Sequence, residues 1–191
     1  MKILILNASP RPKGNISSML RVMEDMLVAS GAEVEFIDVC KLQVRPCIGC
    51  MKCRSERKCV LAEDDSQKVL CKIQECDGLI VGSPCYWGNM TGQLKVLFDR
   101  MAYGMLDDSG HGFPKPLLKG KKAVIVSTST TPWPFNVLFK QTSGAVRAIK
   151  EVIGWSGFKI VGSVQKGGTH MRQGLTDSEI MKCRKAARKL L

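Results

Sequence analysis

The 191-residue sequence contains only two histidines, His111 and His170, and both lie in glycine-containing stretches. A metal site built on histidine is therefore poorly supported. Long apolar runs are also missing: the first stops at Asn7, too soon for the apolar region of a secretory signal. No run approaches the roughly 20 residues of a membrane-spanning helix. We therefore expect a cytoplasmic protein with no membrane partner.

Two nucleotide-binding fingerprints are absent as well. The chain has neither G-x-G-x-x-G nor G-x-x-x-x-G-K-[ST], so a dinucleotide fingerprint and a P-loop ATPase are not supported. Hydrophobic residues make up 45% and charged residues 24%, as in an ordinary globular protein. The length favours a single domain over residues 1–191, with a cysteine-rich insertion loop at about 40–63.

Positive charge is concentrated near the end of the chain. The formal net charge is +12, and residues 140–191 hold eleven Lys/Arg against three acids. This bias favours anionic partners such as phosphorylated cofactors, although a solvated basic helix face is the simpler explanation. The aromatic residues are not interleaved with the basic ones, so we expect no nucleic-acid partner.

Apolar segments alternate with helical patterns along the chain. The expected strands are 2–6, 33–39, 78–82, 123–127 and 158–164. The expected helices are 16–29, 64–76, 90–101, 143–153 and a closing helix from 176. Continuous apolar strands that alternate with helices predict an α/β fold, a doubly wound parallel sheet with helices on both faces.

The most specific motif is a group of four cysteines. They follow the pattern C-x2-C-x2-C-x5-C at Cys47, Cys50, Cys53 and Cys59. Thiolates this close in sequence can surround one iron–sulfur cluster or one zinc ion. A site without any metal is the third interpretation, and the spacing alone leaves all three open.

The loop after the first strand has the chemistry of a phosphate site. It runs from Ser9 to Ser17 and provides two hydroxyls, the Asn15 amide and the Arg11 cation just before a helix. Ligands of such sheets bind at the carboxyl ends of the strands, and free N–H groups at a helix start suit an anion. The alternative is that Asn15 or Ser17 is only a helix cap.

A second loop, residues 82–92, follows the third strand and contains Tyr86 and Trp87. Two aromatic side chains beside several backbone amides can border a flat ring with polar edges. Alone, they would more often be a packing cluster. Beside a phosphate loop, they indicate a mononucleotide such as FMN.

Two motifs resemble those of a known family. S-x-R-x-x-G-N-x-S after the first strand, and P-x-Y-W-G-N-M-T-G followed by L-K-x-x-x-D-R, look like the flavodoxin-like NAD(P)H-dependent FMN reductases. The four-cysteine pattern looks like their iron–sulfur flavoprotein branch. The resemblance implies a flavodoxin-like five-stranded parallel sheet in the order 2-1-3-4-5. It also implies FMN bound at subunit interfaces of a homodimer or homotetramer.

The resemblance also assigns residues. The FMN phosphate would be held by Ser9, Arg11, Asn15, Ile16 and Ser17. The ring would be bordered by Pro84, Cys85, Tyr86, Trp87, Gly88 and Asn89. Further contacts would come from Thr128 and Ser129, although T-T-P-W-P stands where the family often has glycines. A [4Fe–4S] cluster would be ligated by Cys47, Cys50, Cys53 and Cys59.

These assignments favour an FMN-dependent oxidoreductase that takes electrons from NADPH or NADH. The acceptor, a small molecule or a protein, is not identified, and the cluster is one route to it. The alternative is an iron–sulfur flavoprotein that carries single electrons between protein partners without its own NAD(P)H turnover. A zinc-bearing nucleic-acid binder is a third, non-redox hypothesis. No catalytic side chain is assigned, because the cofactor carries the chemistry.

Overall fold

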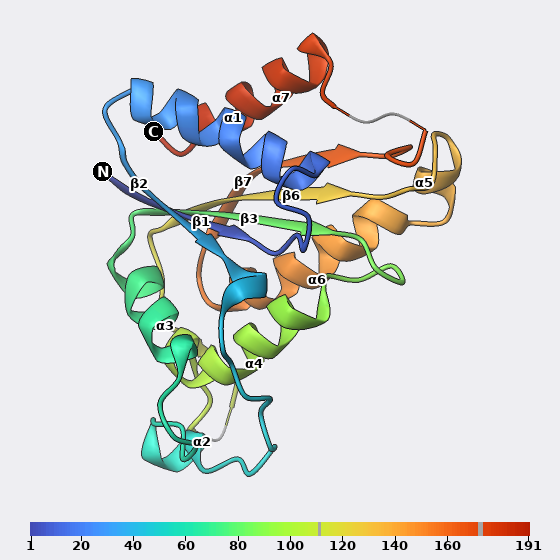
Figure 1. Ribbon diagram of the computed structural model, residues 1–191. Helices are drawn as coiled ribbons and strands as arrows, with labels where there is room; N and C mark the ends of the chain where they lie inside the picture. The colour runs from blue at the N-terminus through green and yellow to red at the C-terminus, as the bar shows by residue number, and fades with distance from the viewer. Residues whose placement is uncertain (111, 172–173) are drawn as a thin grey trace.

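The computed structural model describes residues 1–110, 112–171 and 174–191. Its centre is a five-stranded, fully parallel sheet in the order β2-β1-β3-β6-β7 (Figure 1). The strands are β1 (Lys2–Asn7), β2 (Glu33–Asp38), β3 (Gly78–Pro84), β6 (Lys122–Thr128) and β7 (Lys159–Lys166). Counted by strand, this is the predicted flavodoxin-like order 2-1-3-4-5, and the expected fold class is confirmed.

Helices cover both faces of the sheet (Figure 1). One face carries α1 (Asn15–Ala29) and α7 (Asp177–Arg188), and the other carries α3 (Asp65–Glu75), α4 (Gly92–Met105) and α6 (Gln141–Trp155). Alternation along β1 explains how both layers are held. Ile3 and Ile5 join the core under α1 and α7, while Leu4 and Leu6 join the opposite core, because successive side chains of a strand point to opposite faces.

Five short elements were not expected from the sequence. They are η1 (Val39–Lys41), α2 (Cys53–Glu56), β4 (Leu106–Asp107), β5 (Lys115–Pro116) and α5 (Phe135–Leu138). Each has two to four residues, too few for a hydrophobic period to emerge. The helix α2 is a correction to the sequence analysis, because it adds one helical turn to a cysteine segment that was expected to be only a loop.

The sheet has one reversal of strand order that matters for ligand binding. The chain moves outward from β1 to β2, then returns to β3 on the other side of β1 before continuing to β6 and β7. The crevice outside the carboxyl ends of β1 and β3 is therefore the expected ligand site. Among the described residues, no helix combines the length and the apolar character needed to cross a membrane.

Candidate functional site

A pocket of about 660 Å³ lies at this reversal of strand order. It is formed by the loops that follow β1, β3 and β6, together with the segment after β7. Its lining consists of residues 9–16, Ser18, residues 84–86, residues 128–130, Thr169 and Gly174. The volume falls within the usual range for cofactor sites, about 300 to 1,000 Å³.

The loop after β1 wraps around one carbonyl group. The carbonyl oxygen of Arg11 accepts hydrogen bonds from the Gly14 backbone N–H (3.0 Å) and from the Ser17 hydroxyl (2.9 Å). The Arg11 backbone N–H donates in turn to Ser9 Oγ at 3.2 Å. A Cβ at position 14 would lie 2.9 Å from Arg11 Cβ, so the turn requires glycine. The loop is therefore held in shape by its own bonds.

The N-terminus of α1 opens into this pocket. Gly14 is its N-cap, no side chain caps it, and the first turn contains no acid. The Oδ1 atom of Asn15 is buried and has no hydrogen-bond partner among the described residues. Arg11 and Lys13 are the cations of the described lining, which contains no carboxylate. Uncapped N–H groups and positive charge together suit an anionic group such as a phosphate, and the unused Asn15 oxygen can accept a hydrogen bond from a donor group of the ligand.

Ser17 is used inside the protein. It is buried, does not line the pocket, and its hydroxyl accepts a hydrogen bond from Asn7 Nδ2 at 3.1 Å. Asn7 also donates to Asp38 Oδ1 at 2.9 Å. Burial acts to raise the pKa of Asp38, but hydrogen bonds from Lys41 and Asn7 outweigh it and hold that pKa below its usual value. Ser17 therefore shapes the phosphate loop, and its contact with a phosphate stays a prediction.

The loop after β3 forms a tight turn. The backbones of Tyr86 and Asn89 exchange hydrogen bonds at 2.9 and 3.0 Å, and Trp87 and Gly88 between them have positive φ of 54° and 72°. This is the two-residue hairpin geometry that favours glycine at its second central position. It places the Trp87 side chain, 102% exposed, at the tip of the loop.

Only some of the residues predicted to border the isoalloxazine ring of FMN line the pocket. Pro84, Cys85 and Tyr86 line the pocket, whereas Trp87, Gly88 and Asn89 do not. The turn is supported from behind by α6, where a Cβ at Gly144 would lie only 2.2 Å from the Gly88 carbonyl oxygen. The contacts predicted for the three turn residues stay predictions.

Cys85 is a protonated thiol at neutral pH. Burial raises its pKa, and backbone hydrogen bonds from Gly88 and Asn89 only partly oppose this effect. The thiol donates to the backbone carbonyl of Gln141 at 2.9 Å. Cys85 therefore adds no charge to the pocket and ties the β3 loop to the start of α6.

The far wall of the pocket comes from the loops after β6 and β7. Thr128, Ser129 and Thr130 line it, and the cofactor contacts predicted for Thr128 and Ser129 stay predictions. Thr169 and Gly174 were missed in the sequence analysis. Thr169 donates to the Ser129 carbonyl through its backbone N–H and its hydroxyl, both at 3.1 Å. The position of this segment after the last parallel strand was the signal that could have identified it.

The four predicted metal ligands line one cavity, distinct from the first pocket. It measures about 190 Å³, and Cys47, Cys50, Cys53 and Cys59 contribute to its wall. Burial, followed by the nearby thiols of the other three, raises the pKa of Cys53. Within the described ranges, no three His, Cys, Asp or Glu side chains stand in a metal-binding arrangement. The cysteines therefore share a cavity without forming a closed ligand set.

Arg100 of α4 lines the same cavity and is 2% exposed. Its Nη1 lies 2.6 Å from Asp64 Oδ2 and 2.8 Å from the Arg45 carbonyl oxygen, and its Nη2 lies 3.5 Å from the Ala62 carbonyl oxygen. Burial acts to raise the pKa of Asp64, but hydrogen bonds from Ser66 and the Arg45 N–H and the Arg100 charge hold it below its usual value.

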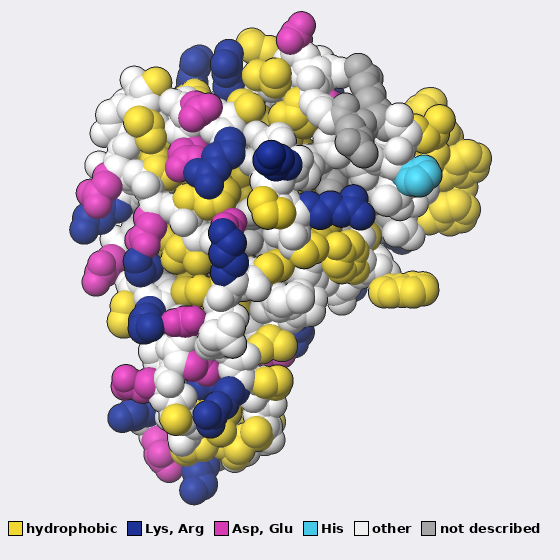
Figure 2. Space-filling view, viewed as in Figure 1, with side chains coloured by type: hydrophobic (Ala, Val, Ile, Leu, Met, Phe, Trp, Pro, Cys, Tyr) yellow, Lys and Arg dark blue, Asp and Glu magenta, His cyan; other side chains and the backbone are white. Residues whose placement is uncertain are grey.

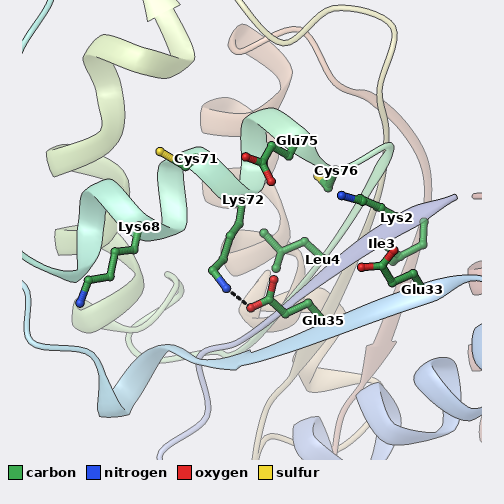
Figure 3. A pocket seen from close by; sticks show the side chains of 10 residues that line it. All are labelled: Lys2, Ile3, Leu4, Glu33, Glu35, Lys68, Cys71, Lys72, Glu75 and Cys76. Atoms are coloured by element: carbon green, nitrogen blue, oxygen red, sulfur yellow. Dashed lines mark hydrogen bonds and ion pairs between the residues drawn. The ribbon is translucent and has the colours of Figure 1, made fainter.

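A third pocket lies elsewhere and shows no such features (Figure 3). Lys2 and Leu4 of β1, Glu33 and Glu35 of β2, and residues of α3 surround it. Figure 3 shows Lys72 paired with Glu35, so the charges there neutralise one another. His111, considered above for metal binding, lies outside the described residues.

Comparison with known protein families identifies the family of this chain. A family model described as NADPH-dependent FMN reductase matches residues 1–142, the part of the chain that contains β1 to β6 and the cysteine segment. The chain belongs to this family. The resemblance seen in the two sequence motifs is thereby confirmed.

Several family relatives carry the name iron-sulfur flavoprotein. One from Methanocaldococcus jannaschii is 42% identical over 100 residues, which cover 52% of this chain and 51% of that protein. One from Clostridioides difficile is 27% identical over 193 residues, which cover 100% of this chain and 78% of that protein. The chain spans about half the length of the first curated relatives that it matches.

One solved structure shares the fold of this protein. An NAD(P)H:quinone oxidoreductase from Methanothermobacter marburgensis superposes with a TM-score of 0.73 at 20% sequence identity. The match covers 100% of this chain and 99% of that protein. At this identity the likeness establishes the fold alone.

Proposed function

We propose that this protein is an FMN-dependent oxidoreductase that takes electrons from NADPH or NADH and passes them to a small-molecule or protein acceptor. The observation that carries the proposal is the 660 Å³ pocket at the β1–β3 reversal, into which an uncapped helix N-terminus opens. Family membership and the names of the relatives support it. Bound FMN would supply the redox chemistry, hydride acceptance from a nicotinamide and release of electrons singly or in pairs.

The chain's own residues hold and orient this cofactor. Arg11 and the N–H groups at the start of α1 bind the phosphate, and the orphaned Oδ1 of Asn15 accepts a hydrogen bond from the ligand. Residues 84–86 and residues 128–129, which line the pocket, would border the ring. Ser9, Ile16 and Ser17 would complete the phosphate site, and Ser9 and Ser17 also hydrogen-bond the Arg11 backbone within the loop. The Trp87–Asn89 turn covers the ring's edge.

The four cysteines supply the sulfur ligands of an all-thiolate site. They share one cavity whose wall also includes apolar residues such as Ile48 and Leu106. Cys47, Cys50, Cys53 and Cys59 would ligate a [4Fe–4S] cluster, which supplies single-electron transfer when bound. Zinc accepts the same four sulfurs, so the bound metal is identified by measuring the metal content of the protein.

An exposed apolar segment supports a homodimer or homotetramer as the working form. Residues 133–139 contain Trp133, Phe135, Leu138 and Phe139, which are between 50% and 78% exposed. Figure 2 shows hydrophobic side chains gathered at the edge where Figure 1 places α5. This segment directly follows the β6 loop of the pocket. A second copy seated here would extend the wall of the FMN pocket. We propose no nucleic-acid or membrane partner, and a cytoplasmic location.

The phosphate site is tested by comparing FMN with riboflavin, which lacks the phosphate. Fluorescence titration should show that Arg11→Ala weakens FMN binding about tenfold, since a charge-assisted contact contributes about 1.5 kcal/mol. Riboflavin binding should not change. Lys182→Ala, an exposed cation on α7, is the matched control. Equal loss of FMN and riboflavin binding would contradict the assignment.

The activity is tested on protein prepared without oxygen. Bleaching of bound FMN by NADPH or NADH supports the oxidoreductase. Reduction by a reduced ferredoxin-like protein but by neither nucleotide would favour the electron carrier instead. A protein that takes up no FMN would overturn the proposal.

A further inference from the structure

Arg100 is an unusual residue for the inside of a protein. Its side chain is 0% exposed, although it lies on α4 beside the cavity that the four cysteines line. A guanidinium ion is strongly destabilised by burial unless its charge is compensated and its donors are used. Its surroundings should therefore account for every one of its N–H groups.

The terminal nitrogens of Arg100 are accounted for. They contact Asp64 and the backbone carbonyls of Arg45 and Ala62. Arg45 precedes the first cysteine of the motif and Ala62 follows the last one. One side chain thus holds together the two ends of the cysteine segment.

The Nε–H of Arg100 is not accounted for. It is buried and has no hydrogen-bond partner in the described part of the chain. The residue nevertheless lines the cavity of Cys47, Cys50, Cys53 and Cys59. Four thiolates would give this cavity a strongly negative charge, and sulfur accepts hydrogen bonds from N–H groups. The unpaired Nε–H of Arg100 thus lies beside a cavity whose four sulfurs can accept hydrogen bonds.

We propose that Arg100 is the positioning residue of the cysteine site, and that its Nε–H donates a hydrogen bond to a sulfur of the group held by the four cysteines. This inference rests on the cysteine-held cluster of the proposed function. Hydrogen bonds to cluster sulfurs and nearby positive charge stabilise the reduced form and raise the reduction potential. Arg100 therefore sets the potential of the site as well as holding its loop.

The test compares Arg100→Lys with the wild-type protein, both prepared without oxygen. Lysine keeps the charge but has no Nε–H, so the cluster potential, measured by EPR-monitored titration, should shift to a more negative value. Arg54→Lys is the matched control, because it makes the same change in an arginine that lines the same cavity but is 53% exposed and paired with Asp108. It should shift the potential less than Arg100→Lys.

A structural role alone has a different signature. It would lower the iron content and the thermal midpoint of Arg100→Lys but leave unchanged the potential of the fraction that holds a cluster. That result would overturn the inference, as would an equal shift in Arg54→Lys.

A measurement on the wild-type protein covers the case in which Arg100→Lys does not fold. Pulsed EPR of protein labelled with ¹⁵N-arginine should show a ¹⁵N coupling to the reduced cluster, and its absence would overturn the inference. Wild-type protein that holds no iron and sulfide would instead overturn the cluster in the proposed function, and this inference with it. Loss of FMN binding would not bear on Arg100.

Discussion

Asp64 should be the residue whose charge contributes most to holding the cysteine segment. Asp64→Asn keeps the side-chain shape and leaves a good N-cap for α3, since asparagine caps as well as aspartate. It removes the negative charge that faces Arg100, whose side chain is 0% exposed, and puts an amide nitrogen in place of the oxygen that accepts from Arg100 and from the Arg45 N–H. Breaking a buried ion pair from one side costs about 3 kcal/mol or more. We therefore expect the free energy of unfolding to fall by about 3 kcal/mol.

Asp64→Ala should add the loss of the cap. Asp64 accepts from the Ser66 backbone N–H at 2.9 Å and forms a capping box with Gln67. Removing such a cap costs about 1 kcal/mol, so the total should be about 4 kcal/mol. Urea unfolding of the reduced, metal-free protein, followed by circular dichroism, measures both losses.

Two further variants separate the causes. Asp65→Asn changes the neighbouring carboxylate, which pairs at the surface with Lys68, and should cause a much smaller loss. The double variant of Asp64→Asn with Arg100→Met leaves no buried charge, so it should be more stable than the sum of the two single losses predicts. A loss in Asp64→Asn no larger than in Asp65→Asn would refute the reasoning.

Three other outcomes follow from the structure. The pKa of Asp64 lies below its usual 3.8, so its contribution to the free energy of unfolding is complete above about pH 4 and is lost at lower pH. The urea midpoint of the wild type should therefore fall more steeply below pH 4 than that of Asp64→Asn. Gly144→Ala should lower stability by about 1–3 kcal/mol and weaken FMN binding, since its Cβ meets the Gly88 carbonyl; urea unfolding and flavin titration check this. Leu138→Ser together with Phe139→Ser should shift the sedimentation coefficient toward that of a monomer, and an unchanged value would exclude residues 133–139 as the interface.

The sheet could be predicted because its strands carry unbroken apolar runs. In β3 and β6, the segments 79–81 and 123–126 are completely buried, as a strand covered on both faces must be. The place of the loop after β1 in the pocket could be predicted for a related reason. This loop directly follows such a strand, and the fold places every loop of that kind at one edge.

The rest depends on contacts between distant parts of the chain. In the sequence, Arg100 is one cation in a helix. Only its hydrogen bonds to the Arg45 and Ala62 carbonyls show that it is buried and joins the two ends of the cysteine segment. The sequence shows Trp87 in the loop after β3, but not the positive φ values of its turn or the close packing of that turn against Gly144 of α6. The shared cavity of the cysteines likewise needs α4, which the motif does not contain.

One helix connects the two pockets, and this has a consequence for how the protein can vary. The loop that borders the 660 Å³ pocket leads directly into α4, and Arg100 and Tyr103 of the same helix line the cysteine cavity. From Gly92 to Tyr103 the helix rises roughly 16 Å, and each residue turns it by about 100°. Substitutions in either loop leave this spacing intact. A single residue inserted into α4 would rotate one pocket by more than a quarter turn relative to the other, so the length of this helix fixes how the two pockets face each other.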